Sequence, residues 1–140
     1  MARIIGIDYG TKRVGLASTD PLQLIASPLT TVAAHELFNF LKDYLAQNPV
    51  EAFVLGLPKN LDNTDSETTQ KVRAFYDLLK KKFPDIPIHW IDERFSSKIA
   101  LDSMIRGGST KKQRQQKGNI DKVSAAIILQ SFLDAKNFLK

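Results

Sequence analysis

The sequence predicts an α/β fold in which a mixed sheet carries helices on both faces. Two short β-branched runs near the start, residues 3–8 and 14–19, are joined by a brief glycine-containing turn, which favours an antiparallel hairpin. Two later strand-like runs, residues 52–57 and 88–91, alternate with segments of helical periodicity. A chain that begins with an antiparallel hairpin and continues with β-α-β units forms a mixed sheet.

The other early elements have signals of their own. Residues 27–32 form a candidate strand, and Pro28 favours a place at the edge of the sheet because proline cannot donate to a neighbouring strand. This brings the predicted sheet to five strands. Apolar residues at helical spacing then predict a helix from about His35 to Asn48.

Helical signals dominate the second half of the chain. Ser66 is a candidate N-cap for a helix that Pro84 stops, and its apolar stripe consists of Val72, Phe75, Leu79 and Phe83. A further helix is expected from about Ser96 to Arg106, closed by Gly107 and Gly108. Residues 109–118 are polar and basic without periodicity, which predicts a mobile loop, and a last helix is expected over about Asp121 to Leu139.

Length and composition favour one domain over residues 1–140, with 43% hydrophobic and 25% charged residues. The absence of cysteine excludes a disulfide framework, a zinc–thiolate site and a cysteine nucleophile. Neither a secretory signal nor a membrane-spanning run is present, so we expect a cytoplasmic protein.

Positive charge is concentrated near the carboxyl end. The net charge is +5, and six cations but one acid lie between residues 106 and 122. A basic patch of this kind attracts phosphate groups.

Three acids occupy places where a sheet of this class forms its sites. Asp8 ends the first strand, Glu93 follows the strand of residues 88–91, and Asp121 opens the last helix. Ligands bind outside the carboxyl ends of parallel strands, so the three are expected to converge if the first strand neighbours the later two. Ser124 and Ala125, three and four residues after Asp121, would leave room for a metal or a phosphate.

Each acid also has a structural explanation: Asp8 as a residue that bonds its own turn, and Asp121 as a helix-start acid favoured by the dipole. As a set they suit phosphodiester cleavage. Hard cations such as Mg²⁺ or Mn²⁺ take carboxylate oxygens, and two such ions can activate a water and stabilise the leaving oxygen.

Four segments carry a family resemblance, in order and over nearly the whole chain. They are IGIDYGTKRVGLA, GLPKNLDN, DERFSS and KGNIDKVSAAIILQ. Together they resemble the YqgF family, also called RuvX, whose members are described as pre-16S rRNA nucleases and as Holliday junction resolvases. The resemblance implies a ribonuclease-H-like fold related to the RuvC resolvase, and a role in maturing the 5′ end of 16S rRNA during ribosome biogenesis.

The same resemblance implies that Asp8, Glu93 and Asp121 are the catalytic and metal-binding acids. Asp92 is an alternative to Glu93, because neighbours on an extended chain point to opposite sides. We prefer Glu93, which the family pattern implies.

Basic residues near these acids are candidates for binding substrate phosphates. The loop cluster, Lys111, Lys112, Arg114 and Lys117, is the strongest, although a solvated loop would have the same composition. Lys12 and Arg13 lie in the first hairpin turn and Arg94 follows Glu93. A solvated turn and a surface ion pair are their structural alternatives.

The resulting hypothesis is a metal-dependent endonuclease acting on structured RNA, with precursor 16S rRNA or the assembling small ribosomal subunit as partner. Two alternatives remain open. A DNA junction resolvase would need a stable dimer to cut two strands, whereas we expect a monomer or weak homodimer. A non-catalytic RNA-binding or transcription-linked module would be favoured if one of the three acids were missing, and none is.

Overall fold

The protein is described from a computed structural model, which covers residues 2–10, 12–57, 67–92 and 117–138. Five strands form one sheet in the order β3-β2-β1-β4-β5. The strands are β1 (Arg3–Tyr9), β2 (Arg13–Thr19), β3 (Ala26–Ala33), β4 (Val50–Leu57) and β5 (Ile88–Asp92). The helices are the 3-10 turn η1 (Ala34–Glu36), α1 (Leu37–Gln47), α2 (Glu67–Lys82) and α5 (Lys117–Phe138).

Strand directions confirm the predicted mixed sheet. β2 pairs antiparallel with both β1 and β3, whereas β4 lies parallel to β1 and to β5. Pro28 lies in the edge strand β3, as predicted, and edge strands are where a sheet tolerates proline. The carboxyl ends of β1, β4 and β5 therefore share one edge of the sheet, which we call the carboxyl edge.

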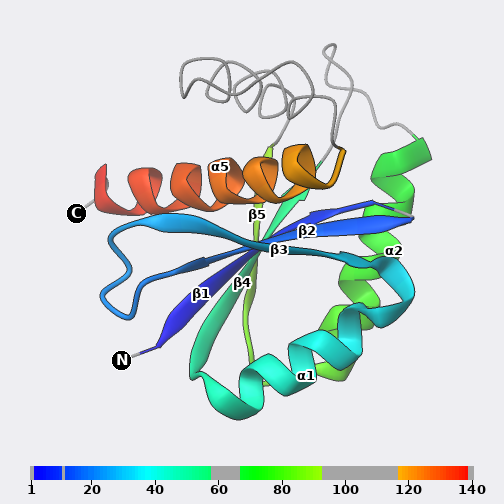
Figure 1. The fold of residues 1–140 in the computed structure, drawn as a ribbon, viewed down its shortest axis with the longest axis horizontal. Coiled ribbons are helices and arrows are strands. Elements are labelled where there is room, and N and C mark those ends of the chain that lie inside the picture. The colour runs from blue at the N-terminus through cyan, green and yellow to red at the C-terminus, as the bar shows by residue number, and fades with distance from the viewer. Residues whose placement is uncertain (1, 11, 58–66, 93–116, 139–140) are drawn as a thin grey trace.

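Helices cover both faces of the sheet (Figure 1). α1 and α2 lie on one face and α5 crosses the other. The α1/α2 face holds a cluster of large buried side chains, centred on Phe53 and the leucines of both helices. The α5 face holds a second cluster in which alanines are prominent. No helix in the described part of the chain is long and apolar enough to cross a membrane.

Two expected features lie outside the described residues, namely the N-cap at Ser66 and the helix over residues 96–106. The last helix differs from expectation, because α5 begins at Lys117 rather than at Asp121. Gly118 was taken to end the preceding loop, yet glycine costs a helix interior only about 1 kcal/mol. The packing of α5 against all five strands outweighs that cost.

Candidate active site

Asp8 lies one residue before the end of β1 and belongs to the α5 side of the sheet. Side chains alternate along the strand: Ile5 and Ile7 are in the α1/α2 cluster, whereas Ile4 is in the α5 cluster. Asp8 is four residues after Ile4, so its side chain lies on the same side of the sheet as that of Ile4, and it is half-buried. The central strand of the sheet thus presents a carboxylate at the carboxyl edge, beneath α5.

Glycines flank Asp8 on both neighbouring strands. In the antiparallel pairing with β2, Asp8 lies opposite Gly15. In the parallel pairing with β4, Ile7 lies opposite Leu55, so the next position along β4 is Gly56. Neither neighbour has a side chain, and the space beside the Asp8 carboxylate on its own side of the sheet is not filled from β2 or β4. A metal ion or a phosphate needs such space.

Close packing at Gly6 fixes the position of α5 over β1. A Cβ atom at Gly6 would lie 2.8 Å from the Cβ of Leu129 and 2.9 Å from the carbonyl oxygen of Ala125. Both distances are too short for a side chain, so glycine is what allows the helix backbone to approach. Ala125 and its neighbour Ser124 are fully buried. Small buried side chains at these positions suit the close approach of α5, and the expectation that they leave room beside Asp121 stays a prediction, because the side chain of Asp121 lies outside the described residues.

Residue 121 lies one helical turn before Ala125 on α5, and therefore on the same side of the helix. The helix runs away from the carboxyl edge as it continues: the Oε1 of Gln130 accepts a hydrogen bond, at 3.0 Å, from the N–H of Ala26, where β3 begins. Position 121 is consequently on the part of α5 nearer to Asp8. The backbone thus brings the first and third predicted acids to one end of one face.

The expectation that Asp121 opens its helix is wrong, and this weakens its structural explanation. α5 begins four residues earlier, at Lys117, and no acid lies in its first turn. The helix dipole acts on charges within the first turn, so it offers Asp121 little stabilisation.

Lys12 in the hairpin turn after β1, and Arg13 at the start of β2, lie at the carboxyl edge. Both side chains are exposed. A Cβ atom at Gly10 would lie 2.5 Å from the carbonyl oxygen of Arg13, so only glycine fits this turn. The N–H of Ala34 donates to the carbonyl oxygen of Lys12 at 3.0 Å, which ties the turn to the end of β3.

β4 separates β1 from β5, so the third strand of the candidate site is not a direct neighbour of the first. β5 ends at Asp92, which lies opposite Leu57. Among the side chains that the structure describes, no three of His, Asp and Glu come together. That set leaves out Glu93 and the side chain of Asp121.

The other predicted substrate-binding residues lie largely outside the described residues. Arg94, Lys111, Lys112 and Arg114 are not among them. Lys117 was expected in the mobile loop, and its backbone instead forms the first residue of α5.

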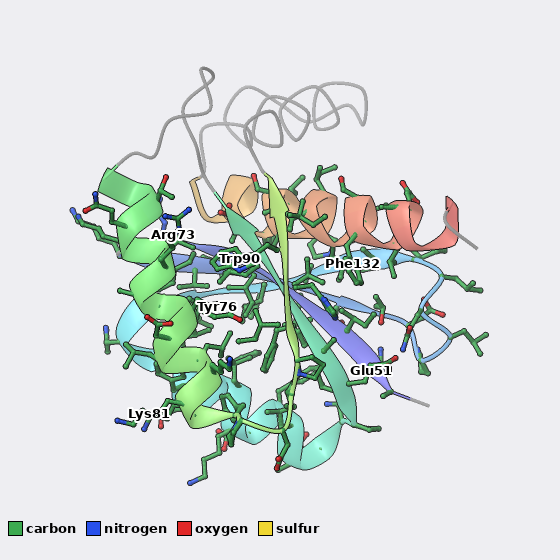
Figure 2. The ribbon with its side chains drawn as sticks, turned by 180° about the vertical axis from the view of Figure 1, so that it is seen from behind. Glu51, Arg73, Tyr76, Lys81, Trp90 and Phe132 are labelled. Carbon is green, nitrogen blue, oxygen red and sulfur yellow. The ribbon has the colours of Figure 1, made fainter. Side chains whose placement is uncertain are left out.

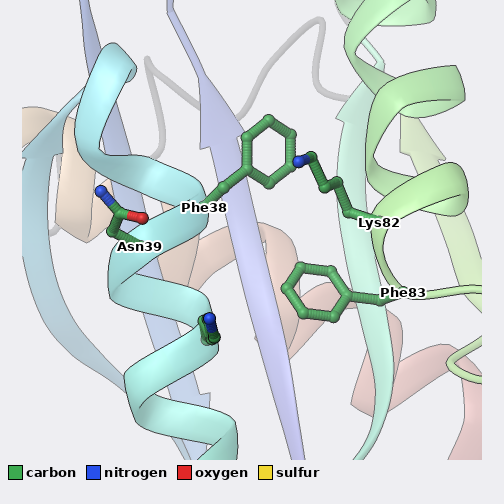
Figure 3. A pocket seen from close by; sticks show the side chains of 5 residues that line it. Phe38, Asn39, Lys82 and Phe83 are labelled. Carbon is green, nitrogen blue, oxygen red and sulfur yellow. The ribbon is translucent and has the colours of Figure 1, made fainter.

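A groove between α1 and α2 lies on the opposite face of the sheet from Asp8 (Figure 3). It has a volume of about 390 Å³ and is lined by Phe38, Asn39, Lys42, Lys82 and Phe83. The Nζ atom of Lys82 lies 5.9 Å from the centre of the Phe38 ring, a cation–π contact. Lys82 also ends α2, where the helix dipole favours a cation, so local structure accounts for this lysine.

Comparison with known proteins places this geometry in a family. A family model described as RuvX, Holliday junction resolvase, matches residues 2–135. A protein of Bacteroides thetaiotaomicron named "Putative pre-16S rRNA nuclease" is 49% identical over 99% of this chain and 100% of its own length. A protein of the same name from Amoebophilus asiaticus is 51% identical over 96% of each chain.

Solved resolvase structures share the fold at low sequence identity. Thermus thermophilus RuvC, in complex with a Holliday junction substrate, has a TM-score of 0.57 at 19% identity, covering 98% of this chain and 96% of that one. The fowlpox virus Holliday junction resolvase has a TM-score of 0.54 at 13% identity, covering 95% and 99%. The predicted ribonuclease-H-like architecture is confirmed.

The family match and the relatives' shared name also confirm the prediction of a nuclease, a hydrolase of phosphodiester bonds. Together with the match over nearly the whole length, they show that this chain belongs to the RuvX family.

Proposed function

We propose that this protein is a metal-dependent endonuclease that processes the 5′ end of precursor 16S rRNA as the small ribosomal subunit is assembled. The name shared by its relatives supports this substrate. The observation that carries the proposal is the setting of Asp8: a carboxylate at the end of the central strand, between two glycines and beneath α5.

Asp8, Glu93 and Asp121 are the proposed catalytic and metal-binding residues. Their oxygen donors suit Mg²⁺ or Mn²⁺, and the chain has no cysteine that would favour a softer ion. When bound, such ions activate a water and stabilise the leaving oxygen. The rigid end of β1 orients Asp8, and the contact of α5 with Gly6 holds position 121 on the same side of the sheet.

Strand alternation favours Glu93 over Asp92 as the second acid. On β5, Trp90 packs in the α1/α2 cluster and Ile91 packs in the α5 cluster. If β5 continued in extended form, residue 93 would be the next position on the α5 side, where Asp8 lies.

Substrate phosphates are proposed to contact two groups of cations. Lys12 and Arg13 extend from the hairpin turn at the carboxyl edge, which places them next to the Asp8 strand end. The second group is Arg94, Lys111, Lys112, Arg114 and Lys117.

The proposed context is a single domain of residues 1–140, acting as a monomer or weak homodimer in the cytoplasm, where bacterial rRNA is made. Sedimentation of the pure protein over a range of concentrations measures its association.

Cleavage assays test the function directly. The pure, full-length protein is incubated with precursor 16S rRNA, with the same RNA in assembling subunits, and with a four-way DNA junction, each in Mg²⁺, Mn²⁺ or EDTA. We expect endonucleolytic cleavage near the 5′ end of the 16S sequence, with either ion and not with EDTA. Cleavage confined to the junction would support a resolvase instead, and undiminished cleavage in EDTA would exclude a metal mechanism.

The cations Lys111, Lys112, Arg114 and Lys117 are expected to bind backbone phosphates rather than to read bases. Contacts to phosphates carry little sequence information. Replacing Lys111, Lys112, Arg114 and Lys117 by Gln should weaken RNA binding most at low salt. Each lost contact should flatten the plot of log affinity against log salt by about 0.7–0.9. An unchanged slope would show that these residues do not contact the phosphates.

A further inference from the structure

A groove follows the edge strand β5 on the side of the sheet away from Asp8. Its first part has a volume of about 490 Å³ and is lined by Arg73, Tyr76, Asp77 and Trp90. Figure 2 shows Arg73 and Tyr76 on α2 and Trp90 on β5. A second hollow of about 240 Å³ begins at the same Tyr76 and extends between Lys80 and Ile88. Because Tyr76 lines both hollows, we treat them as one feature, the β5 groove.

Two aromatic rings form one wall of the β5 groove. The rings of Tyr76 and Trp90 are stacked, with centroids 4.9 Å apart and planes 21° apart. Both side chains are half-buried and pack against the α1/α2 cluster, so their positions are held by the core. Rigid aromatic rings that remain partly accessible are the surfaces on which proteins stack unpaired nucleobases.

Two cations of α2 line the same groove. Arg73 and Lys80 are both exposed, and they lie seven residues apart on α2, about 10 Å along the helix axis. Single-strand binding sites combine cations that contact the phosphates with aromatic rings that stack the bases. Asp77 adds one acceptor, which suits the amino or imino donors of a base and not a phosphate.

The groove lies near the carboxyl edge, on the other face of the sheet from Asp8. Trp90 lies two residues before the end of β5, about 7 Å along the strand. A nucleic-acid strand that is bound on the Asp8 side and continues past the end of β5 would therefore lie close to Trp90.

We propose that the β5 groove binds unpaired nucleotides of the nucleic-acid substrate, with bases stacked on Tyr76 and Trp90 and phosphates held by Arg73 and Lys80. This inference rests on the proposed nuclease function and adds a substrate-binding site to it. The enzyme would thereby favour cleavage where a single-stranded segment adjoins the scissile bond.

Trp90 is the single tryptophan of the chain, so its fluorescence reports on this groove alone. The full-length protein carrying Asp8→Asn, which we expect to prevent cleavage, is titrated in EDTA with a short unstructured RNA and with the same RNA paired to its complement. We expect saturable quenching by the single strand and little by the duplex. Quenching by the duplex at equal affinity, or no quenching by the single strand, would overturn the proposal.

Variants in the groove separate stacking from charge. Tyr76→Leu should weaken single-strand binding about 5- to 150-fold, the range for loss of one stacked base. Arg73→Gln and Lys80→Gln should each flatten the salt dependence of binding by about 0.7. Because Arg73 and Lys80 are exposed, these two variants keep the test valid if Tyr76→Leu fails to fold.

A matched control lies on α1. Phe40 and Tyr44 are also stacked, with centroids 6.1 Å apart, beside a hollow of about 290 Å³ whose lining includes Asp43 and no cation. Tyr44→Leu should leave single-strand binding unchanged. If it weakens binding as much as Tyr76→Leu does, aromatic loss acts through general destabilisation and the proposal is wrong.

Cleavage by the wild-type protein is measured separately, so that the two hypotheses can fail independently. Cleavage of precursor rRNA without any quenching of Trp90 would reject the groove and keep the nuclease. Quenching by single strands without cleavage of any substrate would reject the proposed function and keep the groove as a binding site.

Discussion

The two faces of the sheet are packed in different ways. On the α1/α2 face, large side chains fill the space between the layers, among them Phe53, Leu16, Leu37 and Leu79. On the α5 face, the contact is between Gly6 and the backbone of α5, with Ala17, Ala52 and Ala125 close by. The α1/α2 face stabilises the fold mainly through buried apolar area, whereas the α5 face brings a helix and a strand into close contact.

This difference explains why the candidate site lies on the α5 face. Layers separated by large side chains can relax by rotating those side chains, and the distance between the layers then changes. A helix that touches a strand through glycine and alanine has no such freedom. The position of residue 121 relative to Asp8 is therefore set by backbone contact, which suits a site whose groups must be held precisely.

The largest expected effect comes from Asp8→Asn, at the end of the closely packed face. We expect cleavage to fall at least about a hundredfold, because a metal site contributes several kcal/mol to the transition state. If the three acids converge as proposed, the variant should melt no earlier than wild type without metal, since removing one carboxylate relieves their repulsion. It should lose most of any rise in melting temperature that Mg²⁺ produces, because asparagine is a weaker ligand.

Asp43→Asn is the matched control, because Asp43 is an exposed acid on α1 on the other face. It should change neither cleavage nor the response to Mg²⁺. Melting curves with and without Mg²⁺, together with cleavage rates, test both variants. An Asp8→Asn protein that is clearly destabilised without metal and still cleaves would give Asp8 a structural role and remove the basis of the proposed site.

The next prediction concerns the free energy of unfolding of two variants. Gly6→Ala adds a methyl group on the α5 face, and Ile7→Val removes one on the α1/α2 face. Gly6→Ala places a Cβ against the Leu129 Cβ and the Ala125 carbonyl oxygen, neither of which can rotate away. We expect a loss of about 1–3 kcal/mol in the free energy of unfolding, the usual cost of overpacking. This exceeds the gain of about 0.4–1 kcal/mol that alanine brings by restricting the unfolded chain.

Ile7→Val, at the next residue of β1, should cost about 0.5–1.5 kcal/mol by leaving a small cavity on the α1/α2 face. The two variants, Gly6→Ala and Ile7→Val, should differ more in cleavage rate than in stability, because only Gly6→Ala displaces α5. Urea unfolding and cleavage rates at a temperature where both variants are folded measure the two quantities. Equal cleavage by both would mean that the position of α5 is not critical to the site.

Much of the fold was predictable because each strand has a local signal. The β-branched runs, the hairpin turn with Gly10 and the edge position of Pro28 depend on neighbouring residues, and the structure confirms them. Asp8 could be placed at a strand end for the same reason. Its glycine neighbours could not be identified, because the pairing of Asp8 with Gly15 and the alignment with Gly56 depend on register between strands.

Predictions failed where tertiary packing outweighs local propensity. The start of α5 was placed at Asp121 because residues 109–118 are polar and basic without periodicity, whereas the helix, which packs against the sheet, begins at Lys117. The β5 groove was missed for a related reason. Tyr76 was left out of the apolar stripe of its helix, and Trp90 was interpreted as a core residue. Only the contact of the two rings across α2 and β5 reveals a shared surface.

The smallest expected effect lies outside both faces, in the loop between β2 and β3. The carboxylate of Asp20 accepts hydrogen bonds from the backbone N–H groups of Ile25 and Leu24, each at 2.9 Å, and of Leu22 at 3.2 Å. These bonds, led by the one from Ile25, lower the pKa of Asp20 below its ordinary value of 3.8. Gln23 within the same loop has a positive φ of 59°, so the carboxylate stabilises a turn that is otherwise unfavourable.

A lowered pKa in the folded state means that the folded protein binds the proton less readily than the unfolded chain. The stabilising contribution of Asp20 is therefore fully present above the ordinary pKa and is lost as the pH falls through the lowered one. Asp20→Ala should reduce the melting temperature slightly at pH 6–7, and the difference from wild type should shrink as the pH falls below 3.8. Asp43→Ala, which removes the same charge from an exposed helical position, is the control. Because the loop lies at the amino ends of the parallel strands, neither variant should alter cleavage at neutral pH. A stability difference for Asp20→Ala that is constant from pH 7 to 3 would mean that the loop depends on the size of the side chain rather than on its charge.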